Sequence, residues 1–266
     1  MPASEPAALR APLEAIMREA GAIARETGRG KFKQWTKNDR SPVSEADIAV
    51  NELLHKRLTA LVPGAGWMSE ETTQTPAAGM PEVWIVDPID GTRAFIAGRA
   101  DWTISVALGS HGRPVVASVY APVTDEMFLV SQGAGATLNG APIRVTDGSN
   151  LNGWRLAGPR RYLDRFSQLI ADTQPQPKFY SLALRLARVA HGELDVAFAG
   201  PGAHDWDLAA SDLLVHEAGG MLSDFSGRPP TYNNNPDATQ GALVAAGPLR
   251  HSAVIGLAHD RSIDLT

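Results

Sequence analysis

Hydrophobic residues near the start of the chain recur at the three- and four-residue spacing of amphipathic helices. The apolar side chains between residues 9 and 24 share one helical face, and Gly28 suits the C-terminal cap of that helix. After a polar, basic segment, a second helix is predicted between Ser44 and Pro63, with Asp47 in its first turn. The N-terminal part of the chain therefore begins with two helices.

Short apolar runs bounded by turn residues then predict strands. They lie at residues 67–68, 83–86, 103–108, 115–120, 127–130 and 143–145. After about residue 150 helices at 163–171, 182–191 and 208–218 alternate with strands at 195–198, 221–223 and 242–246. The pattern favours an α/β chain with an α+β half at 1–150 and an α/β half at 151–266, packed as one unit with the site between the halves.

The composition limits the class of protein and the kinds of metal ligand that are available. The chain has 266 residues, 44% of them hydrophobic, and no apolar run reaches the ~20 residues of a membrane span. The N-terminus does not resemble a secretion signal, so we expect a cytoplasmic protein without membrane attachment. The net charge of -5 argues against a dedicated nucleic-acid binder. With no cysteine, any metal ion must be held by oxygen or imidazole, which makes carboxylates the natural ligands.

The most informative segment is an apolar strand that runs into two acids, Asp87 and Asp90. Pro88 restricts Asp87 to an extended conformation, so both carboxylates can point to one side of a turn with the Ile89 carbonyl exposed between them. Hard divalent cations prefer such oxygen clusters. For this short segment alone, a plain surface turn would be the favoured explanation.

Gly91 and Thr92 follow at once and are predicted to open a short helix. The free N–H groups at the start of a helix suit a phosphate group, so a phosphate-binding site would lie next to the acids.

Further acids occur at the starts and ends of predicted elements. Glu70 follows the strand at 67–68, where a solvated loop is the simpler explanation. Asp207 begins a helix and could be a cap, and Asp47 forms a capping-box pattern with Ser44. Capping explains each acid singly, but the recurrence of acids at these positions favours a shared metal site.

Taken together, three segments resemble the inositol monophosphatase superfamily of magnesium-dependent, lithium-sensitive phosphatases. The segments are Ser69-Glu70-Glu71, Trp84 to Thr92 continuing to Ile104–Leu108, and Trp206 to Ala210 continuing to Glu217–Gly220. The resemblance spans most of the chain and implies a layered αβαβα sugar-phosphatase fold and, by resemblance only, a homodimer.

The resemblance also implies roles for individual residues. Glu70, Asp87 and the Ile89 carbonyl would bind a first Mg²⁺, and Asp87, Asp90 and Asp207 a second, with a weaker third ion near Glu70.

The remaining implied roles concern water and substrate. Thr92, paired with Asp47, would position and help deprotonate a metal-activated water, and the N–H groups of Gly91 and Thr92 would bind phosphate oxygens. Asp90 and Asp207 would also contact the substrate.

Members of the superfamily hydrolyse substrates that include adenosine 3',5'-bisphosphate, inositol monophosphates and histidinol phosphate. Inositol enzymes often carry a glutamate seven residues before the last aspartate, whereas this chain has Gly200. Arg185 falls where bisphosphate nucleotidases often have a lysine, which favours a second phosphate; the alternative places Arg185 and Arg188 on a solvated helix face. Lys37 is either solvated or part of a segment that closes over the site.

The expected protein is therefore a Mg²⁺-dependent phosphatase for a small phosphorylated metabolite, with adenosine 3',5'-bisphosphate favoured over inositol 1-phosphate and histidinol phosphate. A non-catalytic regulatory homodimer is the alternative of another class, although the intact set of acids argues against it.

Overall fold

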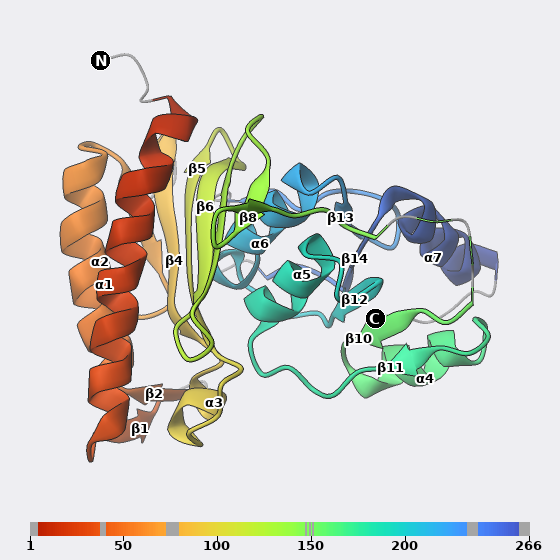
Figure 1. Cartoon of the computed structure of the whole chain (residues 1–266), viewed down its shortest axis with the longest axis horizontal. Coiled ribbons are helices and arrows are strands. Elements are labelled where there is room, and N and C mark those ends of the chain that lie inside the picture. Colours follow the sequence, from red (N-terminus) through yellow and green to blue (C-terminus); the bar gives the residue numbers. More distant parts are fainter. Residues whose placement is uncertain are drawn as a thin grey trace.

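Five layers of helices and sheets make up the computed structural model (Figure 1). It describes residues 5–37, 41–72, 80–146, 148, 150, 152–232 and 239–260. From one side to the other the layers are two long helices, a seven-stranded sheet, two central helices, a five-stranded sheet and two outer helices. This arrangement confirms the predicted layered α/β fold.

The first layer contains α1 (Arg10–Arg29), preceded by the 3₁₀ turn Pro6–Leu9, and α2 (Glu45–Leu61). Both helices bury the apolar faces that the sequence pattern predicts. The predicted end of α1 at Gly28 is wrong, because the helix continues to Arg29 and Gly30 is the C-cap. Gly28 serves a packing purpose instead: an added Cβ would lie 3.2 Å from the Phe95 ring.

A short hairpin links the two helices. It consists of β1 (Gln34–Thr36) and β2 (Pro42–Ser44), which pair in antiparallel fashion.

The seven-stranded sheet has the order β3-β4-β5-β6-β7-β8-β9, in which only the β3–β4 pair is parallel. Its strands are β3 (Gly66–Ser69), β4 (Glu82–Asp90), β5 (Thr103–Ser110), β6 (Arg113–Ala121), β7 (Glu126–Ser131), β8 (Ala136–Leu138) and β9 (Ala141–Pro142). The strand predicted at 143–145 is wrong, since pairing ends at Pro142. The strand predicted at 83–86 is correct but short, because β4 continues through Asp87 to Asp90.

The second half of the chain supplies the other layers. The central helices are α5 (Leu182–Ala190) and α6 (Asp205–Glu217), and one core cluster joins them to both sheets. The five-stranded sheet contains β10 (Arg155–Ala157), β11 (Gln174–Pro175), β12 (Val196–Ala199), β13 (Met221–Asp224) and β14 (Leu243–Ala246), in the order β11-β10-β12-β14-β13. The outer helices are α4 (Arg160–Ser167) and α7 (Pro248–Asp260).

Two predictions differ here. The helix expected at 163–171 begins earlier and ends earlier as α4, with Pro159 at its N-cap, and α7 was not expected. The two sheets lie on either side of the predicted boundary near residue 150, where residues 147, 149 and 151 fall outside the described residues. Within the described ranges, no helix has the length and apolar character needed to cross a membrane.

Candidate active site

The two acids of the Asp87-to-Asp90 segment lie at the end of β4, where the pairing with β5 is irregular. The register shifts between Asp87 and Asp90, and Pro88 offers no N–H to the ladder. Asp87 accepts a hydrogen bond from the Ile89 N–H at 3.0 Å. The predicted turn is therefore a bulged strand end, which brings both carboxylates to one edge of the sheet.

Glu70 reaches the same edge because β3 runs parallel to β4. Its N–H donates to the Val86 carbonyl at 3.2 Å, directly before Asp87. The carboxylate of Glu70 accepts a hydrogen bond from Lys37 Nζ at 2.9 Å, and the same nitrogen donates to Glu71 at 2.7 Å. The interpretation of Lys37 as a solvated lysine is wrong, since its side chain is only 23% exposed.

Asp207 comes from the other half of the chain, at the first turn of α6. Its Oδ2 accepts a hydrogen bond from the His204 N–H at 2.7 Å, as in a capping box. One carboxylate oxygen of each of Asp87, Asp90 and Asp207 lies within 4.8 Å of the others. The structure thus brings together acids that are far apart in the sequence.

Hydrogen bonds from α5 fix the orientation of Asp90. Its Oδ2 accepts from the Ser181 hydroxyl and from the Ala183 N–H, both at 2.6 Å, and its Oδ1 accepts from the Leu182 N–H at 3.2 Å. Ser181 also contacts the Thr103 hydroxyl at 2.9 Å. Sequence reasoning missed Ser181, although a serine directly before a predicted helix is a recognisable cap.

Gly91 and Thr92 form the start of α3 (Thr92–Ile96), as predicted. Gly91 has a φ of 93°, and a Cβ there would lie 3.1 Å from the Ser181 nitrogen, so glycine is required for this close approach. The Thr92 hydroxyl lies 3.2 Å from Asp47 Oδ1 and 3.1 Å from the Ile89 carbonyl oxygen.

Asp47 contacts both of its predicted partners, the start of α2 and Thr92. Its Oδ2 caps α2 by accepting from the Ser44 N–H at 2.9 Å and the Ser44 hydroxyl at 2.6 Å. The other oxygen, Oδ1, faces Thr92. One buried carboxylate therefore both starts a helix and orients a hydroxyl of the site.

Negative charge on Asp87, Asp90 and Asp207 is destabilised by burial and by repulsion from neighbouring acids. Burial, followed by repulsion from the neighbouring acids, raises the pKa of Asp87 well above its ordinary value. Loss of hydration raises the pKa of Asp207 to about 8, and repulsion from Asp90 adds to the effect. Burial raises the pKa of Asp90 to about 6 despite its three hydrogen bonds. A cation shared by these acids would remove the conflict.

A cavity of about 400 Å³ opens over the acids. It is lined by all the predicted metal-binding and substrate-binding residues, whereas Asp47 lies behind Thr92. The lining also includes Arg93 and three residues that sequence reasoning did not single out, Lys178, Phe179 and Tyr180. These three lie between β11 and α5, where no periodic pattern marks them.

Arg185 lines the cavity, but its guanidinium is largely engaged. Two of its nitrogens donate to the carbonyls of Phe198 at 2.9 Å and Phe179 at 3.1 Å, while Nε is buried with no partner among the described residues. Arg188 forms two hydrogen bonds of 2.6 Å with Glu126. The alternative of a solvated face is therefore wrong for both arginines.

Comparisons with known proteins agree with this geometry. The sequence model of the inositol monophosphatase family matches residues 6–261. The chain is 29% identical to an inositol-1-monophosphatase of Mesorhizobium japonicum over 94% of this chain and 95% of that protein. It is 36% identical to the Nus factor SuhB of Pseudomonas aeruginosa over 72% of this chain and 75% of that protein.

Solved structures show the same fold. The crystal structure of the extragenic suppressor protein SuhB from Bartonella henselae has a TM-score of 0.81 and 26% identity, covering 94% of this chain and 97% of that one. The motifs, the fold and the family match agree with one another, and the chain therefore belongs to the inositol monophosphatase family, as a metal-dependent phosphatase.

Proposed function

We propose that this protein is a Mg²⁺-dependent phosphatase whose substrate is a small phosphate monoester with a second phosphate, adenosine 3',5'-bisphosphate being the favoured example. The observation that carries the proposal is a cavity with acids on one wall and the cations Arg93, Lys178 and Arg185 elsewhere in its lining. The acids suit metal ions that hold the reacting phosphate, and the cations suit further negative charge on the substrate.

The donor set fits Mg²⁺. Every candidate ligand is an oxygen, one oxygen from each of three carboxylates lies within 4.8 Å of the others, and burial together with repulsion from neighbouring acids raises the pKa of each. Asp87, Asp90 and Asp207 would hold one ion, and Glu70, Asp87 and the Ile89 carbonyl another. When bound, two such ions activate the attacking water and neutralise charge on the phosphate during an in-line displacement.

The chain's own groups would then orient the reactants. The Thr92 hydroxyl donates a hydrogen bond to Asp47 Oδ1, which leaves a lone pair of the Thr92 oxygen to accept a hydrogen bond from the attacking water. As the water loses its proton to Thr92, Thr92 would pass its own proton to Asp47. The N–H groups of Gly91 and Thr92, at the start of α3, have no intrahelical acceptor by position and suit the phosphate oxygens. Ser181 and the start of α5 hold Asp90 in place through 2.6 Å hydrogen bonds.

Gly200 supports a substrate other than inositol phosphate. An added Cβ at this position would lie 4.0 Å from a guanidinium nitrogen of Arg161 and 3.6 Å from Pro159. The carboxylate that inositol enzymes often present to hydroxyl groups is therefore missing at this position, which borders Pro159 and the Arg161 guanidinium instead. Inositol 1-phosphate remains the second candidate, because several relatives carry the name inositol monophosphatase. Histidinol phosphate and a regulatory homodimer are further candidates.

The test is phosphate release by the purified protein with Mg²⁺ from matched concentrations of the three phosphate esters, with and without Li⁺ and EDTA. We expect the highest kcat/KM for adenosine 3',5'-bisphosphate, and loss of activity with EDTA. A higher kcat/KM for inositol 1-phosphate would transfer the assignment to the second candidate. No turnover of any ester would instead favour a regulatory role.

A further inference from the structure

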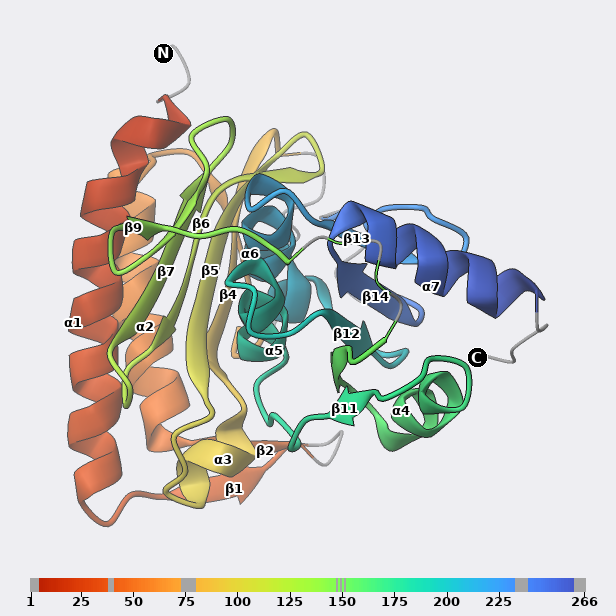
Figure 2. The same ribbon diagram turned by 45° about the vertical axis from the view of Figure 1, so that its right-hand side comes forward.

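The start of α5 is held by two residues of the segment that connects α3 to β5 and begins β5. α5 belongs to the second half of the chain and lies against the seven-stranded sheet (Figure 2). The Asp101 carboxylate accepts a hydrogen bond from the Tyr180 N–H at 3.1 Å, and the Asp101 carbonyl accepts one from the Ser181 N–H at 3.2 Å. The Thr103 hydroxyl lies 2.9 Å from the Ser181 hydroxyl. Asp101 and Thr103 therefore connect the two halves of the chain at the start of α5.

The hydrogen bond between Thr103 and Ser181 has a defined direction. A hydroxyl carries one proton, and Ser181 donates its own to the Asp90 carboxylate at 2.6 Å. The Ser181 oxygen already accepts a hydrogen bond from the Leu184 N–H at 2.8 Å. The Thr103 hydroxyl must therefore donate to Ser181. The result is a chain of hydrogen bonds from Thr103 through Ser181 to Asp90, and all three side chains are buried.

This chain ends at a carboxylate that the proposed function assigns to a metal ion. Asp90 lies opposite Thr103 in the β4–β5 pair, where the register shifts between Asp87 and Asp90. Because regular pairing is interrupted there, the sheet alone does not fix the direction of the Asp90 carboxylate. The contacts from α5 do so, since both carboxylate oxygens accept hydrogen bonds from the start of that helix.

We propose that Thr103 and Asp101 are positioning residues for the metal site, which act by fixing Ser181 and through it the orientation of Asp90. The inference rests on the proposed function, because the orientation of Asp90 matters when this carboxylate holds Mg²⁺. The hydrogen bond from Thr103 polarises the Ser181 hydroxyl and strengthens its bond to Asp90. Asp101 holds the backbone that carries Ser181. Neither residue lines the cavity, so both act through α5 alone.

The test of Thr103 is calorimetric titration of Mg²⁺ into the metal-free protein. Thr103→Val keeps the shape of the side chain and removes the hydroxyl, so we expect Mg²⁺ to bind about fivefold more weakly, and Thr103→Ser to restore most of the affinity. Ser181→Ala should weaken binding about tenfold. The double variant should bind no more weakly than Ser181→Ala, because Thr103 acts through Ser181. A loss of about fiftyfold, the product of the two single effects, would overturn this role.

Asp101 is tested by removing its carboxylate in two ways. Asp101→Ala should weaken Mg²⁺ binding about fivefold, because the Tyr180 N–H loses its acceptor. Asp101→Asn should have a smaller effect, since the amide oxygen can still accept that hydrogen bond while the ion pair with Arg99 is lost. An equal loss in both variants would assign the effect to the ion pair and would overturn the role of Asp101 in holding α5.

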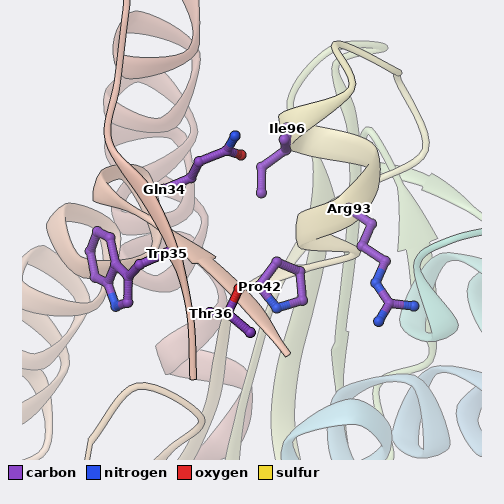
Figure 3. A pocket seen from close by; sticks show the side chains of 6 residues that line it. All are labelled: Gln34, Trp35, Thr36, Pro42, Arg93 and Ile96. Carbon is purple, nitrogen blue, oxygen red and sulfur yellow. The ribbon is translucent and has the colours of Figure 1, made fainter. Parts of the chain in front are cut away.

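Two controls remove a threonine hydroxyl outside this chain of hydrogen bonds. Thr36 lines a hollow of about 470 Å³ between the β1–β2 hairpin and α3, and Figure 3 shows it on the hairpin beside Pro42. Thr137 lies on β8, where its hydroxyl donates to the Leu129 carbonyl at 3.2 Å. Thr36→Val and Thr137→Val should bind Mg²⁺ as the wild type does. A loss in either control as large as that in Thr103→Val would overturn the specific role of Thr103.

Hydrogen exchange in the metal-free protein provides a readout that does not depend on the ion. Thr103→Val and Asp101→Ala should each speed the exchange of the Leu182 and Ala183 N–H groups, which donate to Asp90, about fivefold, and leave the amides of β6 unchanged. Unchanged exchange at these two positions, or an equal increase in β6, would overturn the inference. If the wild type binds no Mg²⁺, the proposed function fails, and the exchange rates alone decide whether Thr103 and Asp101 hold the start of α5 on Asp90.

Discussion

The raised pKa values of the acid cluster should make Mg²⁺ bind more tightly as the pH rises. Asp207 has a pKa of about 8 without metal, so at pH 7 about a tenth of it is ionised, and ionising it fully costs about 1.4 kcal/mol. A metal ion binds only the ionised form. The apparent affinity should therefore rise about ninefold between pH 6 and 7 and about fivefold between pH 7 and 8 from this group alone, and more steeply if Asp87 also loses a proton.

Stability should follow the same linkage. A carboxyl group whose pKa is raised by folding stabilises the folded protein. This contribution is fully present below the pKa of the group in the unfolded chain, and it is lost as the pH rises through the pKa in the folded protein. For Asp90 this loss extends from the ordinary pKa of 3.8 up to about pH 6, and for Asp207 it extends from 3.8 up to about pH 8. The metal-free Tm should therefore still fall between pH 6 and pH 8 because of Asp207, and the increase in Tm on adding Mg²⁺ should be larger at pH 8 than at pH 6.

Calorimetry in two buffers with different ionisation enthalpies would count the protons released per Mg²⁺ at pH 7. We expect about one or more for the wild type, and about one fewer for Asp207→Asn. Asp212→Asn is the control, because Asp212 is also buried with a raised pKa but pairs with Arg113 and Tyr232 away from the cavity. A Mg²⁺ affinity that stays constant within a factor of two between pH 6 and 8 would refute the reasoning.

Other variants test separate parts of the site. Asp90→Asn should abolish turnover while leaving circular dichroism unchanged, and near-wild-type phosphate release would contradict the metal assignment. Thr92→Val should lower kcat by about a hundredfold or more, because the hydroxyl beside Asp47 is lost; an unchanged pH–rate profile and kcat would exclude this role. Ser181→Ala should raise the Mg²⁺ concentration needed for half-maximal activity about tenfold, with partial rescue by Ser181→Thr. Gly91→Ala should destabilise the protein by about 1–3 kcal/mol in thermal unfolding, since it puts a Cβ against the Ser181 nitrogen at a positive φ; an unchanged Tm would argue against that strain.

Local chemistry made much of this site predictable from the sequence. Asp87 and Asp90 follow a strand whose apolar run is unmistakable, and Ser44 with Asp47 forms a capping box in both the pattern and the structure. The family resemblance then predicted which acids would meet. What it could not supply was the bulge that keeps Asp90 within β4, because that depends on the pairing with β5.

The missed residues depend on contacts between distant parts of the chain. Lys178 and Tyr180 lie in a connection without periodicity, and only the fold brings that connection to the cavity. The outer helix α7 is different, because its buried residues His251, Val254 and Ala258 have helical spacing that could have been recognised. Its apolar face is weak, since few large side chains mark it.

The bond between Ser181 and Asp90 spans 91 positions of the chain. Both this bond and the approach of Asp207 need the central helices to be docked against the first sheet, so no early, locally formed piece of the protein can present the complete set of ligands. Contacts between such distant residues form late when loop closure limits folding. The recovery of tight Mg²⁺ binding during refolding should therefore coincide with the final kinetic phase, and the ion can serve as a reporter of the completed fold.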